Sequence, residues 1–189
     1  MSSMEVGSMN IATKVFSTSR LLLLGLIAGS AIFAGCAQAP TNDEPRRYCF
    51  KALRSSSCVT APGSSAQEKS AVRTLSPAPG VSRLIVIRHQ WPDLQGVAQL
   101  SIDGKPVQRM IPASTIAIDL QPGSHVVTVD PTDENGSVSL STSPGQVLTI
   151  ELKKTSWSPR RFVVRELDQE AALVAMRDTT ILGVFSVDR

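Results

Sequence analysis

The sequence predicts a mostly β fold, an antiparallel β-sandwich of about seven strands with one C-terminal helix. Apolar and polar residues alternate over several short runs, so that each strand would have one dry and one wet face, as at Ala98, Leu100 and Ile102. Turn signals separate these runs, among them Asp103-Gly104 and Pro122-Gly123. Many short strands divided by turns are typical of sandwiches and small barrels.

The individual strands follow from these runs in chain order. Residues 83–88 have a β-branched apolar centre between charged ends, which favours a central strand buried on both faces. Pro122-Gly123 is expected to form a type II turn between two paired strands, with the glycine supplying the positive φ. Residues 181–187 are expected to add a last edge strand or to trail away. The other strands are expected at residues 98–103, 116–120, 127–129, 138–140, 147–152 and 161–167.

A helix is predicted over residues 168–176. Asp168 is a suitable N-cap, and Glu170 suits the positive end of the helix dipole. Three apolar residues fall on one side of this helix, namely Ala172, Leu173 and Met176. We therefore expect that side to pack across an open end or face of the sandwich.

The chain begins with the pattern of a secretory leader. A polar start that carries Lys14 and Arg20 precedes an apolar run over residues 21–35. That run is shorter than the roughly 20 residues that a membrane-spanning helix needs, although an uncleaved membrane anchor is the alternative. Its end, Phe33-Ala34-Gly35-Cys36, resembles the bacterial lipobox. The resemblance implies that residues 1–35 are a lipoprotein signal peptide and that Cys36 is acylated, which anchors the protein to a membrane.

The residue after the acylated cysteine bears on the location of such lipoproteins. An aspartate there favours retention in the inner membrane, but this chain has Ala37. The resemblance therefore implies attachment to the outer membrane, on its periplasmic face. Several acyl chains together anchor stably, since each buried CH₂ contributes about 0.8 kcal/mol.

Residues 36–80 are predicted to be a flexible tether that carries the lipidated cysteine. The segment is rich in Ser, Ala, Pro and Thr, and no period of a strand or helix persists in it. Cys49 and Cys58 form an even pair in an oxidising compartment, which favours a disulfide that staples the tether and not the core. Two free thiols, or a metal pair with further ligands, are the alternatives. The sandwich domain is expected to span residues 81–189.

Two turn motifs resemble those of PEGA-type β-sandwich modules and of related uncharacterised bacterial lipoproteins. They are Ile102-Asp103-Gly104-Lys105 and Leu120-Gln121-Pro122-Gly123-Ser124-His125. Ser143-Pro144-Gly145-Gln146 fits the same scheme, whereas the Pro-Glu-Gly-Ala signature itself is absent. The resemblance covers about residues 83–183 and implies a β-sandwich. These families have no established catalytic residues that could be assigned to positions of this chain.

The candidates for chemistry favour a protein without a catalytic residue, a metal or a cofactor. A metal site at His125 would draw on the carboxylates of Asp103, Asp119 and Asp130, but a cross-strand partner is the favoured interpretation of this histidine. His89, at a strand end, is expected to be a packing residue. Neither a G-x-S-x-G elbow nor a phosphate-binding glycine loop is present. The net charge of +3 gives no support for nucleic-acid binding.

Three classes of function remain. The favoured class is a structural or protein-interaction module that contacts envelope proteins through a strand edge or loops. The alternative is a module that binds cell-wall glycan, in which Trp157 stacks on a sugar ring while Arg160 and Arg161 meet anionic groups. A small hydrolase is the third class.

The lipobox resemblance generates the first prediction. A Cys36→Ser variant expressed in bacteria should accumulate as unprocessed precursor, because the thiol that accepts the diacylglycerol is lost. Labelling with a fatty-acid analogue should disappear in this variant and persist in the parent. Persistent labelling of the serine variant would contradict the assignment of Cys36.

Overall fold

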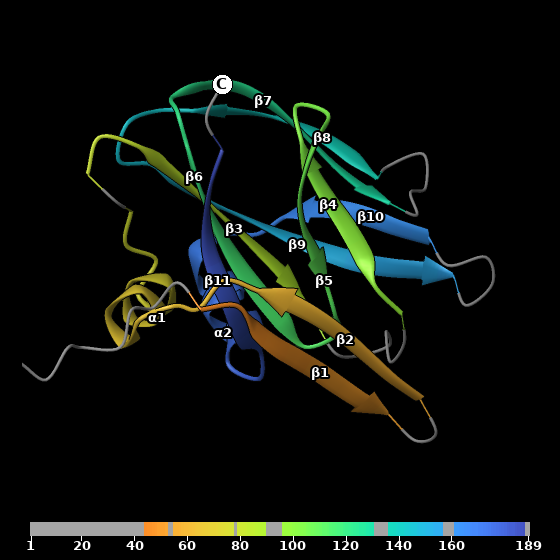
Figure 1. Cartoon of the computed structure of the whole chain (residues 1–189). Coiled ribbons are helices and arrows are strands. Elements are labelled where there is room, and N and C mark those ends of the chain that lie inside the picture. The colour runs from red at the N-terminus through yellow and green to blue at the C-terminus, as the bar shows by residue number, and fades with distance from the viewer. Residues whose placement is uncertain are drawn as a thin grey trace, which may run out of the picture. The chain divides into compact units, whose positions relative to one another are not determined.

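The fold is described from a computed structural model of the chain (Figure 1). It describes residues 44–52, 55–77, 79–89, 96–130, 136–156 and 161–187. All of these residues belong to one compact unit, which spans Gln38–Arg189. No helix in the described ranges is long and apolar enough to cross a membrane.

The larger sheet contains the most deeply buried strand. Its order is β10-β9-β3-β6-β11, and these strands comprise Arg161–Glu166, Val147–Ser156, Ser82–Arg88, Ser114–Leu120 and Thr180–Val187. Every residue of the central strand β3 is buried, which confirms the strand expected from its apolar run. β3 pairs with β6 antiparallel but with β9 parallel, and β11 runs parallel to β6. This sheet is therefore mixed and not purely antiparallel as expected.

The smaller sheet is antiparallel throughout. Its order is β5-β4-β7-β8, and these strands comprise Lys105–Met110, Ala98–Ile102, Gly123–Asp130 and Ser137–Thr142. β4 and β5 are joined by the predicted Asp103-Gly104 turn, in which φ is 51° and 78°. Positive φ at both central residues is the signature of a type I′ hairpin turn.

The two sheets face each other across one apolar core, as a β-sandwich requires. The larger sheet contributes Leu84, Val86, Ile116 and Ile118, and the smaller sheet contributes Leu100, Ile102, Val127 and Val129. Arg88 is also fully buried; its guanidinium lies 4.8 Å from the centre of the Phe162 ring and donates to the carbonyl oxygen of Met110. The predicted class, a mostly β sandwich, is confirmed.

Two short helices cover the outer face of the larger sheet. They are α1 (Ala66–Arg73) and α2 (Gln169–Met176), and both pack onto the side of β3 that faces away from the sandwich core. Asp168 caps α2 as expected, because its carboxylate accepts from the amide of Ala171 at 2.8 Å. The guanidinium of Arg73 on α1 donates to the carbonyl oxygens of Met176 and Thr179, and so ties the end of α2 to α1.

The first strands lie in the segment that was predicted to be a tether. β1 (Arg46–Ala52) and β2 (Ser55–Ala61) form an antiparallel hairpin, and Cys49 and Cys58 face each other in it and are joined by a disulfide. Val59 and Ala61 are buried in the sandwich core. The folded domain therefore begins near residue 46 and not at residue 81. The prediction was wrong here because β2 has only a short apolar alternation within a polar, serine-rich stretch.

The hairpin lies across the side of the sandwich where the edge strands β5 and β11 leave the core open (Figure 1). On the β5 side, the Gln108 carboxamide donates to the carbonyl oxygen of Thr60 at 3.1 Å. On the β11 side, a Cβ added at Gly183 would lie 3.3 Å from the carbonyl oxygen of Pro62, so the chain after β2 approaches β11 closely.

The Pro122-Gly123 segment also differs from expectation. It joins β6 to β7, and these strands belong to different sheets, so it carries the chain across the sandwich and does not close a hairpin. Gly123 has a φ of 144°, and its amide donates to Thr142 Oγ1 on β8 at 3.2 Å. A local turn signal gives the position of a reversal but not the sheet to which each strand belongs.

The packing of the hairpin on the core predicts a measurable effect of the disulfide. A Cys49→Ser/Cys58→Ser double variant should lose about 2–3 kcal/mol of unfolding free energy, from the chain entropy of a loop of this length. Chemical denaturation should show one transition for the parent and for the variant, because the hairpin belongs to the core. Unchanged stability, or a separate early transition of the hairpin, would show that the hairpin is an appendage.

Candidate functional site

The structure reaches only some of the residues predicted to contact a ligand. Cys36, Trp157 and Arg160 lie outside the described residues. Arg161 opens β10, but its side chain is not described. β9 and β10 pair as the expected antiparallel hairpin, so residues 157–160 connect two paired strands. Two further cations lie near the end of β9, where Lys153 is exposed and Lys154 is buried.

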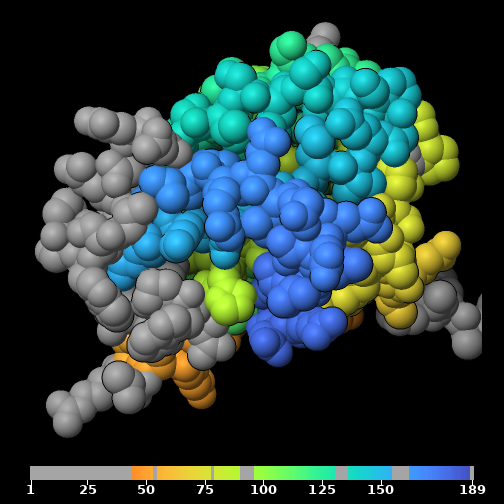
Figure 2. Space-filling model, turned by 180° about the vertical axis from the view of Figure 1, so that it is seen from behind, coloured from red at the N-terminus to blue at the C-terminus, as the bar shows by residue number. Residues whose placement is uncertain are grey.

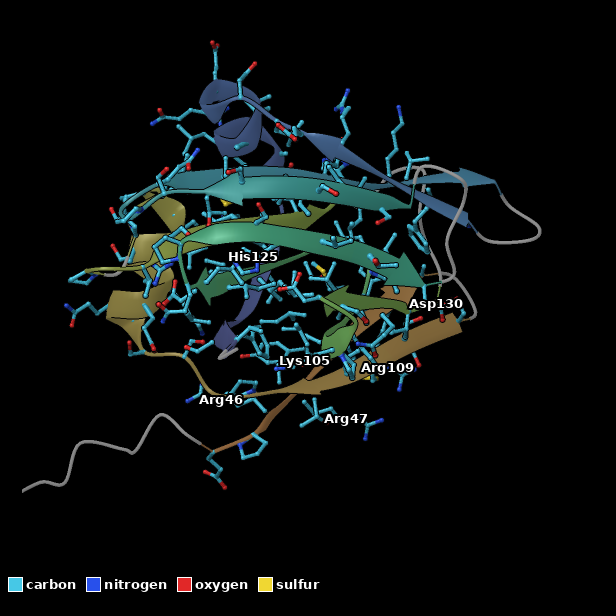
Figure 3. The ribbon with its side chains drawn as sticks, turned by 90° about the horizontal axis from the view of Figure 1, so that it is seen from above. Arg46, Arg47, Lys105, Arg109, His125 and Asp130 are labelled. Atoms are coloured by element: carbon cyan, nitrogen blue, oxygen red, sulfur yellow. A yellow bond between two sulfur atoms is a disulfide. The ribbon has the colours of Figure 1, made fainter. Side chains whose placement is uncertain are left out.

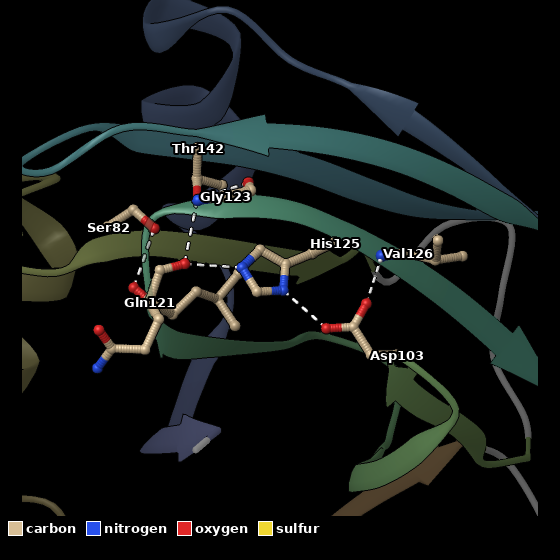
Figure 4. Close-up of polar contacts among 8 residues, drawn as sticks. Ser82, Asp103, Gln121, Gly123, His125, Val126 and Thr142 are labelled. Carbon is tan, nitrogen blue, oxygen red and sulfur yellow. Dashed lines mark hydrogen bonds and ion pairs between the residues drawn. The ribbon is translucent and has the colours of Figure 1, made fainter. Parts of the chain in front are cut away.

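His125 is buried and lies at the centre of a hydrogen-bond network that joins three chain segments (Figure 4). Its Nδ1 lies 2.8 Å from Asp103 Oδ2 in the β4–β5 turn. Its Nε2 lies 2.7 Å from the carbonyl oxygen of Gln121, in the connection between the sheets. The other carboxylate oxygen of Asp103 accepts from the amide of Val126 at 2.8 Å. Both ring nitrogens therefore lie within hydrogen-bond distance of an oxygen, one from each neighbouring segment.

This geometry favours a structural role for His125. Of its three possible carboxylate partners only Asp103 contacts it, because Asp119 makes a bidentate ion pair with Arg83 at 2.7 and 2.9 Å. No group of three potential metal ligands occurs in the described part of the chain. His125 locks the crossing between the sheets, which is a wider role than the cross-strand partner that was expected.

A more promising surface lies on α2, and we call it the α2 face (Figure 2). Its centre consists of Leu173 and Val174, whose exposed fractions are 39% and 53%. Beside Val174 is a hollow of about 510 Å³, and His89 and Val174 belong to its lining. Four carboxylates line the same hollow: Glu151, Asp168, Glu170 and Asp178.

The geometry of the short helix α2 explains why these apolar side chains point outward. Ala172 and Met176 are one turn apart and are buried against the larger sheet. Leu173 lies one position beyond Ala172, and the rotation of about 100° per residue turns it toward solvent. The expectation that Leu173 packs with Ala172 and Met176 was therefore wrong. The side of α2 that contacts the sheet includes Ala172 and Met176 but does not extend to Leu173.

The carboxylates of the α2 face are held in different ways. Glu151 accepts from Arg165 on the neighbouring strand at 2.7 Å, and Asp168 is occupied as the helix cap. Glu170 lies in the first turn of α2 and Asp178 follows its end. The face therefore combines an apolar centre with an acidic rim.

Comparisons with known proteins do not assign the chain to a family. No family model matches the sequence, and no curated protein matches it significantly.

The network around His125 generates a stability prediction. A His125→Gln variant should lose about 1 kcal/mol, because one carboxamide cannot reach both acceptors and one hydrogen bond of the network is lost. Gln121→Ala is the matched control, since Gln121 contributes only its backbone carbonyl and should leave stability nearly unchanged. Chemical denaturation gives the free energy of unfolding of both variants. If His125→Gln were as stable as the parent, the network would not hold the connection between the sheets in place.

Proposed function

We propose that this chain is a lipid-anchored cell-envelope protein whose β-sandwich is a protein-interaction module without catalytic activity. The observation that carries the proposal is the α2 face, where two aliphatic side chains are exposed within an acidic rim. Apolar centres with polar rims are typical of protein interfaces. Leu173 and Val174 are two of the three large apolar side chains that are exposed among the described residues, and they are consecutive on α2.

The leader supports the location of this module. Acylation of Cys36 would fix the chain to the membrane, and nine residues separate this cysteine from Arg46 at the start of β1. Even fully extended, that segment reaches only about 30 Å. The module would therefore stay close to the membrane, which we take to be the periplasmic side of the outer membrane.

The charges of the α2 face indicate the chemistry of its partner. Glu170 and Asp178 lie near the exposed Leu173 and Val174 and are not joined to a cation by any ion pair among the described residues. A partner that fits would present an apolar side chain between Lys or Arg residues. Complementary charge of this kind speeds association and fixes the orientation of the partners.

Glycan binding remains the second candidate, and the pairing of β9 with β10 favours it. The two strands form one hairpin, and Trp157 and Arg160 belong to the stretch of sequence that connects them. An indole beside cations suits a sugar ring with anionic groups. Cell-wall sedimentation that is lost in Trp157→Ala and Arg160→Ala variants would support this alternative.

The interaction proposal predicts an outcome for crosslinking in intact cells. A photo-crosslinking residue at Arg177, which is exposed just after α2, should yield one discrete protein adduct. A Leu173→Gln/Val174→Gln variant should reduce this adduct at least about tenfold, since burial of each aliphatic side chain contributes about 1.5 kcal/mol or more.

Val126→Gln is the matched control for this experiment. Val126 is also an exposed aliphatic residue, at 44%, but it lies on β7 in the other sheet. Its substitution should leave the adduct unchanged. An adduct that survives the Leu173→Gln/Val174→Gln substitutions, or that Val126→Gln abolishes equally, would exclude the α2 face as the contact surface.

A further inference from the structure

A second hollow lies between the hairpin and the smaller sheet, and we call it the β2–β5 groove. Its volume is about 460 Å³, within the range of about 300–1,000 Å³ that is usual for small-molecule sites. Arg47 and Thr60 line it from the hairpin, and Gln99, Gln108 and Arg109 line it from β4 and β5. Figure 3 shows Arg47 and Arg109 on the same side of the molecule, where the hairpin passes the smaller sheet.

The charge of the β2–β5 groove is unbalanced. Two guanidinium groups line it, those of Arg47 and Arg109, and no carboxylate belongs to its lining among the described residues. Neither guanidinium has a hydrogen bond or an ion pair with any residue in the part of the chain that the structure describes. Two cations that share one hollow repel each other, so an anion between them would be stabilised by both.

Asp130 is the carboxylate that lies nearest to Arg109 in the register of the smaller sheet. Arg109 faces Gln99 on β4, and Gln99 in turn faces Asp130 on β7. Two strand spacings of about 4.8 Å therefore separate the backbones of Arg109 and Asp130. Gln99 lies between them in the register, Asp130 does not line the groove, and no ion pair joins it to Arg109.

The positions of both arginines are fixed by rigid neighbours. Arg47 faces Thr60 across the hairpin, two residues from the Cys49–Cys58 disulfide. Arg109 follows the buried Gln108, whose Nε2 donates to the carbonyl oxygens of Thr60 at 3.1 Å and of Arg109 at 2.9 Å. One carboxamide thus bridges the two walls and fixes the spacing of the backbones that carry the charges. The backbone of the site is therefore in place before a ligand binds, and the cost of ordering falls on the two arginine side chains.

From these observations we propose that the β2–β5 groove binds a phosphate monoester carried on a small polar molecule. Guanidinium groups bind phosphate oxygens through paired, charge-assisted hydrogen bonds. A phosphate monoester carries about 1.5–2 negative charges at neutral pH, which matches two arginines better than one carboxylate does. The Thr60 hydroxyl and the Gln99 carboxamide provide hydrogen-bonding groups for the hydroxyls of a sugar or glycerol. The site lies on the opposite sheet from the α2 face and depends neither on acylation nor on a protein partner.

The test uses the purified full-length protein in nonionic detergent, with glycerol 3-phosphate as the soluble probe. Isothermal titration calorimetry should show saturable binding at one site. Arg47→Gln and Arg109→Gln should each weaken binding at least about tenfold, because each removes a charge-assisted contact. Arg46→Gln is the matched control, since Arg46 is an exposed arginine adjacent to Arg47 that does not line the groove, and it should retain the parent affinity.

A membrane arm distinguishes the source of the phosphate. After removal of the detergent, vesicles of phosphatidylcholine with phosphatidic acid present the same glycerol phosphate on a lipid, and vesicles of phosphatidylcholine alone measure the binding that the acyl anchor gives by itself. Binding of the soluble probe assigns the groove to a free metabolite, whereas binding of only the phosphatidic acid vesicles, lost in the Arg47→Gln variant, assigns it to a lipid headgroup. The proposal is overturned if neither probe binds, or if Arg46→Gln weakens binding as much as Arg47→Gln does.

Discussion

Closure of the open side of the sandwich by the β1–β2 hairpin is the constraint on which the rest of this structure depends. Two facing sheets leave their core exposed wherever their edge strands are not joined, and here β5 and β11 border such an opening. The hairpin fills it with Val59 and Ala61, and the Gln108 carboxamide bonds it to β5. Burial of these apolar side chains stabilises the closed arrangement. The disulfide then holds the two strands of the hairpin in one register.

This closure gives the two sheets different surfaces. The larger sheet is covered by α1 and α2 and presents the α2 face, with aliphatic side chains in an acidic rim. The smaller sheet meets the hairpin and presents the β2–β5 groove, which is cationic. Under the two proposals, the chain engages a protein through one sheet and a phosphorylated molecule through the other. The two surfaces are separate, so each proposal stands or fails by itself.

Much of the sandwich could be predicted from local sequence, because its signals are local. The apolar run of β3, the Asp103-Gly104 turn and the Asp168 cap each depend on neighbours within a few residues. Long-range placement could not be predicted. Pro122-Gly123 has the local appearance of a hairpin turn, yet it crosses between sheets, and nothing near it in sequence records that β7 pairs with β4 and β8 and not with β6. Arg47 and Arg109 come together only because a polar segment folds back on a distant edge strand, so no spacing in the sequence identifies their groove.

Native-state hydrogen exchange tests the central claim, closure by the hairpin, most directly. The backbone amides of β1 and β2 would be followed together with those of β3 as denaturant is raised. If the hairpin completes the core, its most protected amides, such as that of Val59, should exchange only through global unfolding, with the same free energy and denaturant dependence as the amides of β3. If the hairpin amides instead exchange through a low-energy local opening while β3 stays protected, the hairpin is a loosely attached cover and the account of the fold given above is contradicted.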